Sequence, residues 1–317
     1  MKNIYLNIFK FNKKILNKSS KMLSENKLIG VPTETVYGLA GNAYSKTAVN
    51  KIYKIKGRPK KNPIIIHYYN LKRASLDVEI NNKFLKIYKS LCPGPITFVL
   101  KKKRKSKISS AATANLDTVA IRFPKNHIIR SILKKIKFPL AIPSANKSSG
   151  ISPICALDVN DEFKKKKIMI IDGGQSKLGI ESTVLDLTEG AKLLRPGIIS
   201  FKKIARILNQ KISASKKIKK IKSPGQLKKH YSPGIPMYLN KKKPKKNFAF
   251  ITFGGGRVNA KNIFQLSKNS NLEEAAKNLY KTFRLIKKLK YKKIYVSKIP
   301  NKGVGIAIND RLKRASN

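Results

Sequence analysis

Short apolar runs alternate with amphipathic stretches along most of this chain. Apolar residues spaced three or four positions apart predict helices, and β-branched runs predict strands. Helices are expected at residues 13–24, 48–55, 82–90 (with a helical piece at 74–76), 128–136 and 272–289, with a closing helix from residue 307. Strands are expected at residues 4–9, 28–31, 64–66, 96–101, 118–123, 140–142, 168–172, 183–187, 248–253 and 293–296. Because the two kinds alternate irregularly, the pattern favours a twisted, mixed α/β sheet over a strictly parallel doubly wound one.

The pattern breaks between residues 211 and 236. A lysine-rich stretch is followed by two Pro-Gly turns, at residues 223–225 and 232–234. Such turns around a polar segment predict an extended connection that belongs to neither core. From residue 237 the alternation restarts as a small Rossmann-like α/β unit. We therefore expect a first domain at 1–210, a linker at 211–236 and a second domain at 237–317.

The chain is strongly basic, with a formal net charge of +56 over 317 residues. Such a charge ordinarily indicates a nucleic-acid partner. The 71 basic residues comprise 60 lysines and 11 arginines, spread so evenly that no part of the chain stands out as a basic module. A genome-wide drift towards AT-rich codons explains this spread better than a dedicated groove does. Direct RNA binding is therefore only weakly supported.

Cysteine usage and hydropathy limit where the protein works. Two cysteines, Cys92 and Cys155, form neither a metal-binding spacing nor a disulfide framework, which favours a reducing compartment. The N-terminus lacks the uninterrupted apolar core of a signal peptide, and no stretch approaches the roughly 18 apolar residues of a membrane span. We expect a cytoplasmic protein.

The scarcity of arginine makes each arginine informative. Three of the eleven lie in dense motifs: Arg58 in KGRP, Arg122 in TVAIRFP and Arg195 in LLRPG. A position that keeps arginine in a lysine-rich chain indicates a need for its planar, bidentate guanidinium. These three positions therefore predict contacts with anions.

Residues 28–67 concentrate candidate chemistry. A strand leads into a Pro-Thr-Glu-Thr turn, a glycine-bearing loop is expected at residues 37–41, and a helix follows. Lys56-Gly-Arg58-Pro then precedes an isoleucine run that ends at His67. Two strand ends thus bring hydroxyls, a guanidinium, an ammonium and an imidazole together. This inventory suits a ligand with both a phosphate part and a zwitterionic part.

This stretch resembles the signature of the Sua5/YrdC family, the threonylcarbamoyl-AMP synthases. Residues from about 20 to 205 look like the YrdC catalytic domain, 223–234 look like the linker of the long form, and the remainder is similar to the C-terminal Sua5 domain. The resemblance implies condensation of L-threonine, bicarbonate or CO2, and ATP to threonylcarbamoyl-AMP and pyrophosphate. The product serves the threonylcarbamoyladenosine modification of tRNA at position 37, through downstream threonylcarbamoyl transferase proteins. Mg²⁺ is expected to accompany ATP, and no protein metal site is expected.

The resemblance also assigns roles to individual residues. Catalytic roles are implied for Lys56, Arg58, Ser144 and Asn146. ATP contacts are implied for Arg58, Asn62, Thr118, Ser144, Ser152, Arg195 and Tyr231. L-Threonine contacts are implied for Thr35, His67, Arg122, Ile142 and Ser182. The linker segment with His230 and Tyr231 is expected to close over ATP once both substrates are bound.

Two other functions remain as alternatives. The same fold could serve a double-stranded RNA or tRNA binding protein with a concave basic sheet. A carbamoyl-phosphate-using relative from hydrogenase maturation is disfavoured, because that class carries a zinc-finger region and no CxxC occurs here. Pyrophosphate release that depends on threonine, bicarbonate and ATP distinguishes the enzyme from tight, salt-sensitive RNA binding without turnover.

Overall fold

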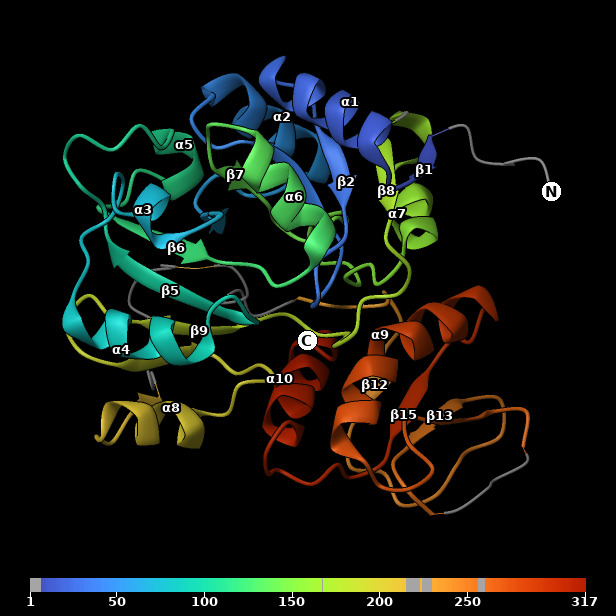
Figure 1. Cartoon of the computed structure of the whole chain (residues 1–317). Coiled ribbons are helices and arrows are strands. Elements are labelled where there is room, and N and C mark those ends of the chain that lie inside the picture. Colours follow the sequence, from blue (N-terminus) through green and yellow to red (C-terminus); the bar gives the residue numbers. More distant parts are fainter. Residues whose placement is uncertain (1–6, 167, 215–222, 224–229, 256–259) are drawn as a thin grey trace.

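The computed structural model describes the chain except residues 1–6, 167, 215–222, 224–229 and 256–259. Its described residues form two β-sheets, each with its own helices (Figure 1). The N-terminal two thirds build the larger sheet, and the chain from residue 237 builds the smaller one. No helix among the described residues is both long and apolar enough to cross a membrane.

The larger sheet is mixed, as the sequence predicts. Its strand order is β1-β8-β2-β3-β7-β4-β6-β5-β9-β10-β11. The strands are β1 (Ile8–Lys10), β2 (Ile29–Val31), β3 (Gly38–Asn42), β4 (Ile66–His67), β5 (Ile96–Lys101), β6 (Thr118–Arg122), β7 (Leu140–Ala141), β8 (Met169–Asp172), β9 (Thr183–Asp186), β10 (Lys192–Arg195) and β11 (Ser213–Ala214). Parallel pairs such as β4–β6 and β5–β9 alternate with antiparallel pairs such as β5–β6 and β4–β7.

Helices cover both faces of this sheet and enclose separate apolar clusters. They are α1 (Lys13–Ser24), α2 (Lys46–Lys56), α3 (Leu71–Ala74), α4 (Asn82–Leu91), α5 (Ser110–Thr113), α6 (His127–Lys135), α7 (Ala156–Phe163), the 3₁₀ helix η1 (Lys164–Lys166) and α8 (Phe201–Leu208). Helices α1 and α6 pack on one face, and α2, α4, α7 and α8 contribute to the core on the other (Figure 1). Asparagine side chains at residues 12, 81 and 126 cap the starts of α1, α4 and α6, which explains why these helices begin there.

The C-terminal unit is a small parallel α/β fold, which confirms the predicted Rossmann-like pattern. Its strands, in the order β12-β15-β13-β14, are β12 (Met237–Tyr238), β15 (Ile294–Val296), β13 (Ala249–Thr252) and β14 (Ile263–Gln265), and its helices are α9 (Leu272–Lys288) and α10 (Gly305–Ala315). Gly179 of the first unit lies against the backbone of Lys277 on α9, so closely that a Cβ there would come within 2.5 Å of the Lys277 Cα. The two units are thus in direct backbone contact.

The structure corrects the loop expected at residues 37–41. Gly38 and Gly41 lie within strand β3, paired with β2 and β7. A Cβ on Gly38 would lie 2.1 Å from the Ile142 side chain, and one on Gly41 would lie 2.7 Å from Leu28. These glycines therefore permit close packing of neighbouring strands and do not mark a loop.

The structure also corrects the interpretation of the linker as a segment outside both cores. Tyr231 is fully buried and belongs to the apolar cluster of the C-terminal unit. The sequence pattern did not predict helices α5, α7 and α8 or strands β10, β11, β12 and β14. Strand β10 has polar residues beside it and only four residues of its own, a length at which periodicity is uninformative.

Candidate active site

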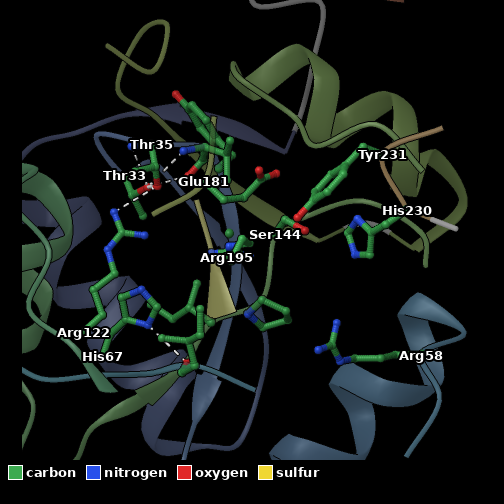
Figure 2. A pocket seen from close by; sticks show the side chains of 16 residues that line it. Thr33, Thr35, Arg58, His67, Arg122, Ser144, Glu181, Arg195, His230 and Tyr231 are labelled. Carbon is green, nitrogen blue, oxygen red and sulfur yellow. Dashed lines mark hydrogen bonds between the residues drawn. The ribbon is translucent and has the colours of Figure 1, made fainter. Parts of the chain in front are cut away.

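A polar cavity opens where several strands of the larger sheet end beside residues 230 and 231. Its lining comprises Thr33, Thr35, Val36, Tyr37, Gly38, Arg58, Ile65, His67, Arg122, Ile142, Pro143, Ser144, Glu181, Arg195, His230 and Tyr231. Figure 2 shows Thr35, Arg122 and His67 on one side and Arg58, His230 and Tyr231 on the other. Ser144 and Arg195 lie between the two groups.

Arg58 is held rigidly at the end of α2. Gly57 terminates that helix in the left-handed conformation (φ +59°), which turns the chain sharply. The Arg58 guanidinium then donates from Nε to the Asn62 carbonyl at 2.9 Å and from Nη2 to the Asn62 Oδ1 and the Pro63 carbonyl, both at 2.7 Å. Burial lowers the pKa of Arg58 to about 10, which still leaves it a cation at neutral pH. A fixed cation of this kind suits a phosphate group.

Lys56 lies one residue before that turn, and its side chain is buried. Its ammonium donates to the Ser144 carbonyl at 2.6 Å and to the Asn146 carbonyl. Burial, followed by the nearby charge of Arg58, lowers the Lys56 pKa well below its usual value. These two bonds hold the Ser144–Asn146 turn in place.

Arg122 ends β6 on the opposite side of the cavity and is only 4% exposed. Its Nη2 donates to the Glu34 carboxylate at 2.7 Å and to the Thr35 hydroxyl at 2.9 Å. Burial opposes ionisation of Glu34, but the charge and hydrogen bond of Arg122 outweigh it and lower the Glu34 pKa. Among the described residues the Arg122 Nε has no hydrogen-bond partner. Nη2 is therefore anchored, whereas the Nε–H on the same edge of the guanidinium has no acceptor among these residues.

His67 is buried beside Arg122, across the β4–β6 pair. Its Nδ1 lies 3.3 Å from the Ile65 carbonyl, which can only accept, so Nδ1 carries the proton. Burial and the neighbouring Arg122 charge lower the His67 pKa well below 6.5. The imidazole is therefore neutral at physiological pH and presents Nε2 as an acceptor.

Ser182 lies behind the middle of the cavity wall and holds Arg195 there. Arg195 donates from Nε to the Ser182 carbonyl and from Nη2 to the Ser182 hydroxyl, both at 3.1 Å. The same hydroxyl lies 2.8 Å from that of Thr97 on β5. These contacts join the start of β9 to β10 and β5 behind the cavity wall, and they hold a third arginine between the two polar groups.

The sequence-predicted site residues fall into three sets. Those that line the cavity are Thr35, Arg58, His67, Arg122, Ile142, Ser144, Arg195 and Tyr231. Those that lie behind the wall, bonded to it or to each other, are Lys56, Asn62, Asn146, Ser152 and Ser182. Thr118 is apart from both, because it begins β6 whereas Arg122 ends it, although alternation along the strand gives the two residues the same face.

Sequence reasoning missed the role of Glu34 and left Glu181 open between orienting the GIES turn and being a solvated acid. Both are buried, and both receive hydrogen bonds from arginines: Glu34 from Arg122 and Glu181 from Arg311 of the C-terminal unit. The chain has only 15 acidic residues, so an acid inside each of the dense motifs PTET and GIES was a signal. Within the described parts of the chain, no three His, Cys, Asp or Glu side chains gather as a metal site would require.

Comparison with known proteins places this geometry in a family. Residues 21–197 match the family described as Telomere recombination (Sua5, YciO and YrdC), and residues 199–317 match the family described as Threonylcarbamoyl-AMP synthase, C-terminal domain. The threonylcarbamoyl-AMP synthase of Pyrococcus abyssi is 35% identical, over 93% of this chain and 92% of the relative. That of Bacillus subtilis is 33% identical, over 94% of this chain and 92% of the relative.

A solved structure agrees over the whole length. The crystal structure of P. abyssi Sua5 complexed with L-threonine matches with a TM-score of 0.89 and 32% identity, and the match covers 98% of this chain and 97% of that one. Sequence and fold therefore agree across both units, and this chain belongs to the Sua5/YrdC family, in its long form with a C-terminal Sua5 domain.

Proposed function

We propose that this chain is an L-threonylcarbamoyladenylate synthase, a nucleotidyltransferase that condenses L-threonine, bicarbonate and ATP to threonylcarbamoyl-AMP and pyrophosphate. The observation that carries the proposal is the division of one cavity into two polar groups. Arg58 marks one side, and Arg122 with His67 marks the other, with Arg195 between them. A triphosphate and an amino acid need opposite ends of this kind to meet in line.

The chemistry needs alignment and charge neutralisation. The threonine amine condenses with bicarbonate, with loss of water, to an N-carboxylate. One of its oxygens attacks the α-phosphorus, and the bond from the α-phosphorus to the oxygen that it shares with the β-phosphate breaks to release pyrophosphate. We assign the threonine carboxylate to Arg122, whose guanidinium lines the cavity and whose Nε–H has no partner among the described residues. We assign the phosphates to Arg58 and Arg195, whose cations stabilise negative charge as it moves to the leaving group. Lys56 holds the Ser144–Asn146 turn that lies between the substrates.

ATP needs more room than the cavity provides in this conformation. The free volume is about 40 Å³, enough for a few water molecules. Sites for ligands of drug size are roughly 300–1,000 Å³. Because His230 and Tyr231 form one wall, we assign the required movement to the segment that carries them. This movement agrees with a linker that opens for ATP and closes over it, which would keep water from the labile mixed anhydride.

The wider setting is part of the proposal. We infer that Mg²⁺ enters with ATP, that the product passes to threonylcarbamoyl transferase proteins acting on tRNA, and that the protein works in the cytoplasm. The comparisons do not favour the alternative of an RNA-binding protein, since the matched relatives are named for the synthase.

Pyrophosphate release by the purified protein tests the proposal. The rate is measured with ATP, L-threonine and bicarbonate together, and then with each of them omitted. We expect release to require all three. Release that continues without threonine, or no release combined with tight, salt-sensitive RNA binding, would contradict the proposal.

A further inference from the structure

The Glu181 carboxylate lines the cavity, yet of its three hydrogen-bond donors among the described residues, two come from the C-terminal unit. Ser152 donates to Oε1 at 2.5 Å from the catalytic unit. Tyr280 of α9 donates its hydroxyl to Oε2 at 2.9 Å, and Arg311 of α10 donates Nε to the same oxygen at 2.8 Å. Glu181 is therefore a residue of the cavity wall whose position depends on two helices of the other unit.

Arg311 also contacts a second residue of the cavity wall. Its side chain is completely buried, and its guanidinium carbon lies 4.9 Å from the centre of the Tyr231 ring. Tyr231 in turn stacks on Tyr280, with ring centres 6.0 Å apart and an angle of 25° between the rings. Asp310 accepts a bond from the Arg311 Nη1 at 2.6 Å and so fixes the other edge of the guanidinium. One buried arginine thus supports both Glu181 and Tyr231.

Glu181 carries a negative charge, so an anionic ligand can bind in the same cavity only if that charge is paired. Burial opposes its ionisation, but the charges of Arg311 and Arg195 and the bond from Ser152 outweigh it and lower its pKa to about 2. Glu181 is therefore a carboxylate at neutral pH, in the same cavity as Arg58 and Arg195. Left unpaired, it would repel a triphosphate and would itself be an uncompensated buried charge.

We propose that Arg311 and Tyr280 are positioning residues for the ATP side of the cavity, and that through Glu181 and Tyr231 the C-terminal domain completes the ATP site. This inference rests on the proposed function. It assigns the C-terminal domain a role in catalysis, because its helices fix two side chains that line the cavity. On the threonine side, the side-chain hydrogen bonds of His67 and Arg122 among the described residues go to Ile65, Glu34 and Thr35, and none reaches this cluster.

Steady-state kinetics of Arg311→Met tests the proposal. We expect the KM for ATP to rise at least tenfold while the KM for threonine stays within twofold. Replacing Glu181 by Gln in the Arg311→Met protein removes the unpaired charge, and we expect this double variant to recover at least threefold of the lost ATP affinity. A role in stability alone would give no such recovery and no difference between the two substrates.

Arg284→Met is the matched control. Arg284 also lies on α9 and also joins the two units, through Asp158 and Glu162, but it does not contact Glu181. We expect the Arg284→Met protein to be less stable to heat, while the ratio of its KM for ATP to its KM for threonine is unchanged. If Arg311→Met does not fold, Tyr280→Phe decides instead, because it removes a single hydroxyl and is expected to raise the KM for ATP about threefold or more.

The outcomes separate this inference from the proposed function. If the unaltered protein forms no threonylcarbamoyl-AMP, the proposed function fails. If the unaltered protein is active, the positioning role is overturned when folded Arg311→Met or Tyr280→Phe protein keeps the ATP KM of the unaltered protein. It is likewise overturned when both KM values rise equally, or when the Arg284→Met control shows the same selective loss for ATP.

Discussion

Replacement of Arg122 by lysine tests the assignment of the threonine side of the cavity. Lysine keeps the positive charge and can still reach Glu34, now held at 2.7 Å by the arginine Nη2. It cannot also present the planar guanidinium that lines the cavity, whose Nε has no partner among the described residues. We therefore expect the fold to survive and the recognition of a carboxylate to weaken.

The expected loss of threonine affinity follows from the hydrogen bond that Arg122→Lys removes. A hydrogen bond between charged groups is worth about 1.5–3 kcal/mol. Loss of one such bond weakens binding roughly 10- to 150-fold. Arg58 and Arg195, which face the phosphates in this assignment, are unchanged by the substitution, so the dissociation constant for ATP should change by about twofold or less.

Isothermal titration calorimetry of the two ligands, each alone, measures the effect directly. Arg130→Lys is the control, since Arg130 stacks on Tyr69 and does not line the cavity. We expect threonine affinity to fall in Arg122→Lys and to remain unchanged in Arg130→Lys. Equal losses for threonine and ATP in Arg122→Lys would refute the assignment of this residue to the amino acid.

Three further predictions concern other parts of the site. Arg58→Ala should lower turnover roughly ten- to a hundredfold, because it removes a charge-assisted phosphate contact of about 1.5–3 kcal/mol, and unchanged ATP-dependent product formation would exclude that role. Trypsin should cut the segment 223–234 more slowly when ATP and threonine are present, at Lys228 or Lys229, which lie outside the described residues. Equal cleavage with and without the ligands would show that the segment only tethers the two domains. His67 binds a proton below pH 6.5 in the unfolded chain but not in the folded one, so its contribution to stability is complete above pH 6.5 and is lost as pH falls below that value. In urea unfolding between pH 6.5 and 5.5, His67→Asn should therefore lose stability less steeply than the unaltered protein, by up to about 1.4 kcal/mol per pH unit, and parallel curves would contradict a neutral buried His67.

The regular elements with strong periodicity were predictable from the sequence. The helix expected at residues 13–24 and the strand expected at 96–101 are found with the same bounds. Residues 37–41 were misassigned because glycine is read as a turn signal, whereas here it permits two strands and a side chain to approach closely. Close approach of this kind depends on tertiary packing, which a local pattern does not contain.

The site could be predicted only as far as motifs reach. Arg58, His67 and Arg122 lie in dense motifs and line one cavity, as the sequence suggested. The pairing of Glu181 with Arg311 joins residues 130 positions apart in the sequence, and neither spacing nor composition reveals it. Tyr231 was expected in a polar linker, but it is buried against the guanidinium of Arg311 and the ring of Tyr280.

Mass spectrometry of the product formed from ¹³C-labelled bicarbonate tests whether this chain makes threonylcarbamoyl-AMP. The protein is incubated with ATP, L-threonine and labelled bicarbonate, and the nucleotide products are separated and weighed. The proposed reaction gives an adenylate that contains threonine, AMP and one carbon from bicarbonate, formed together with pyrophosphate. An adenylate without the labelled carbon, or conversion of ATP to ADP alone, would contradict it.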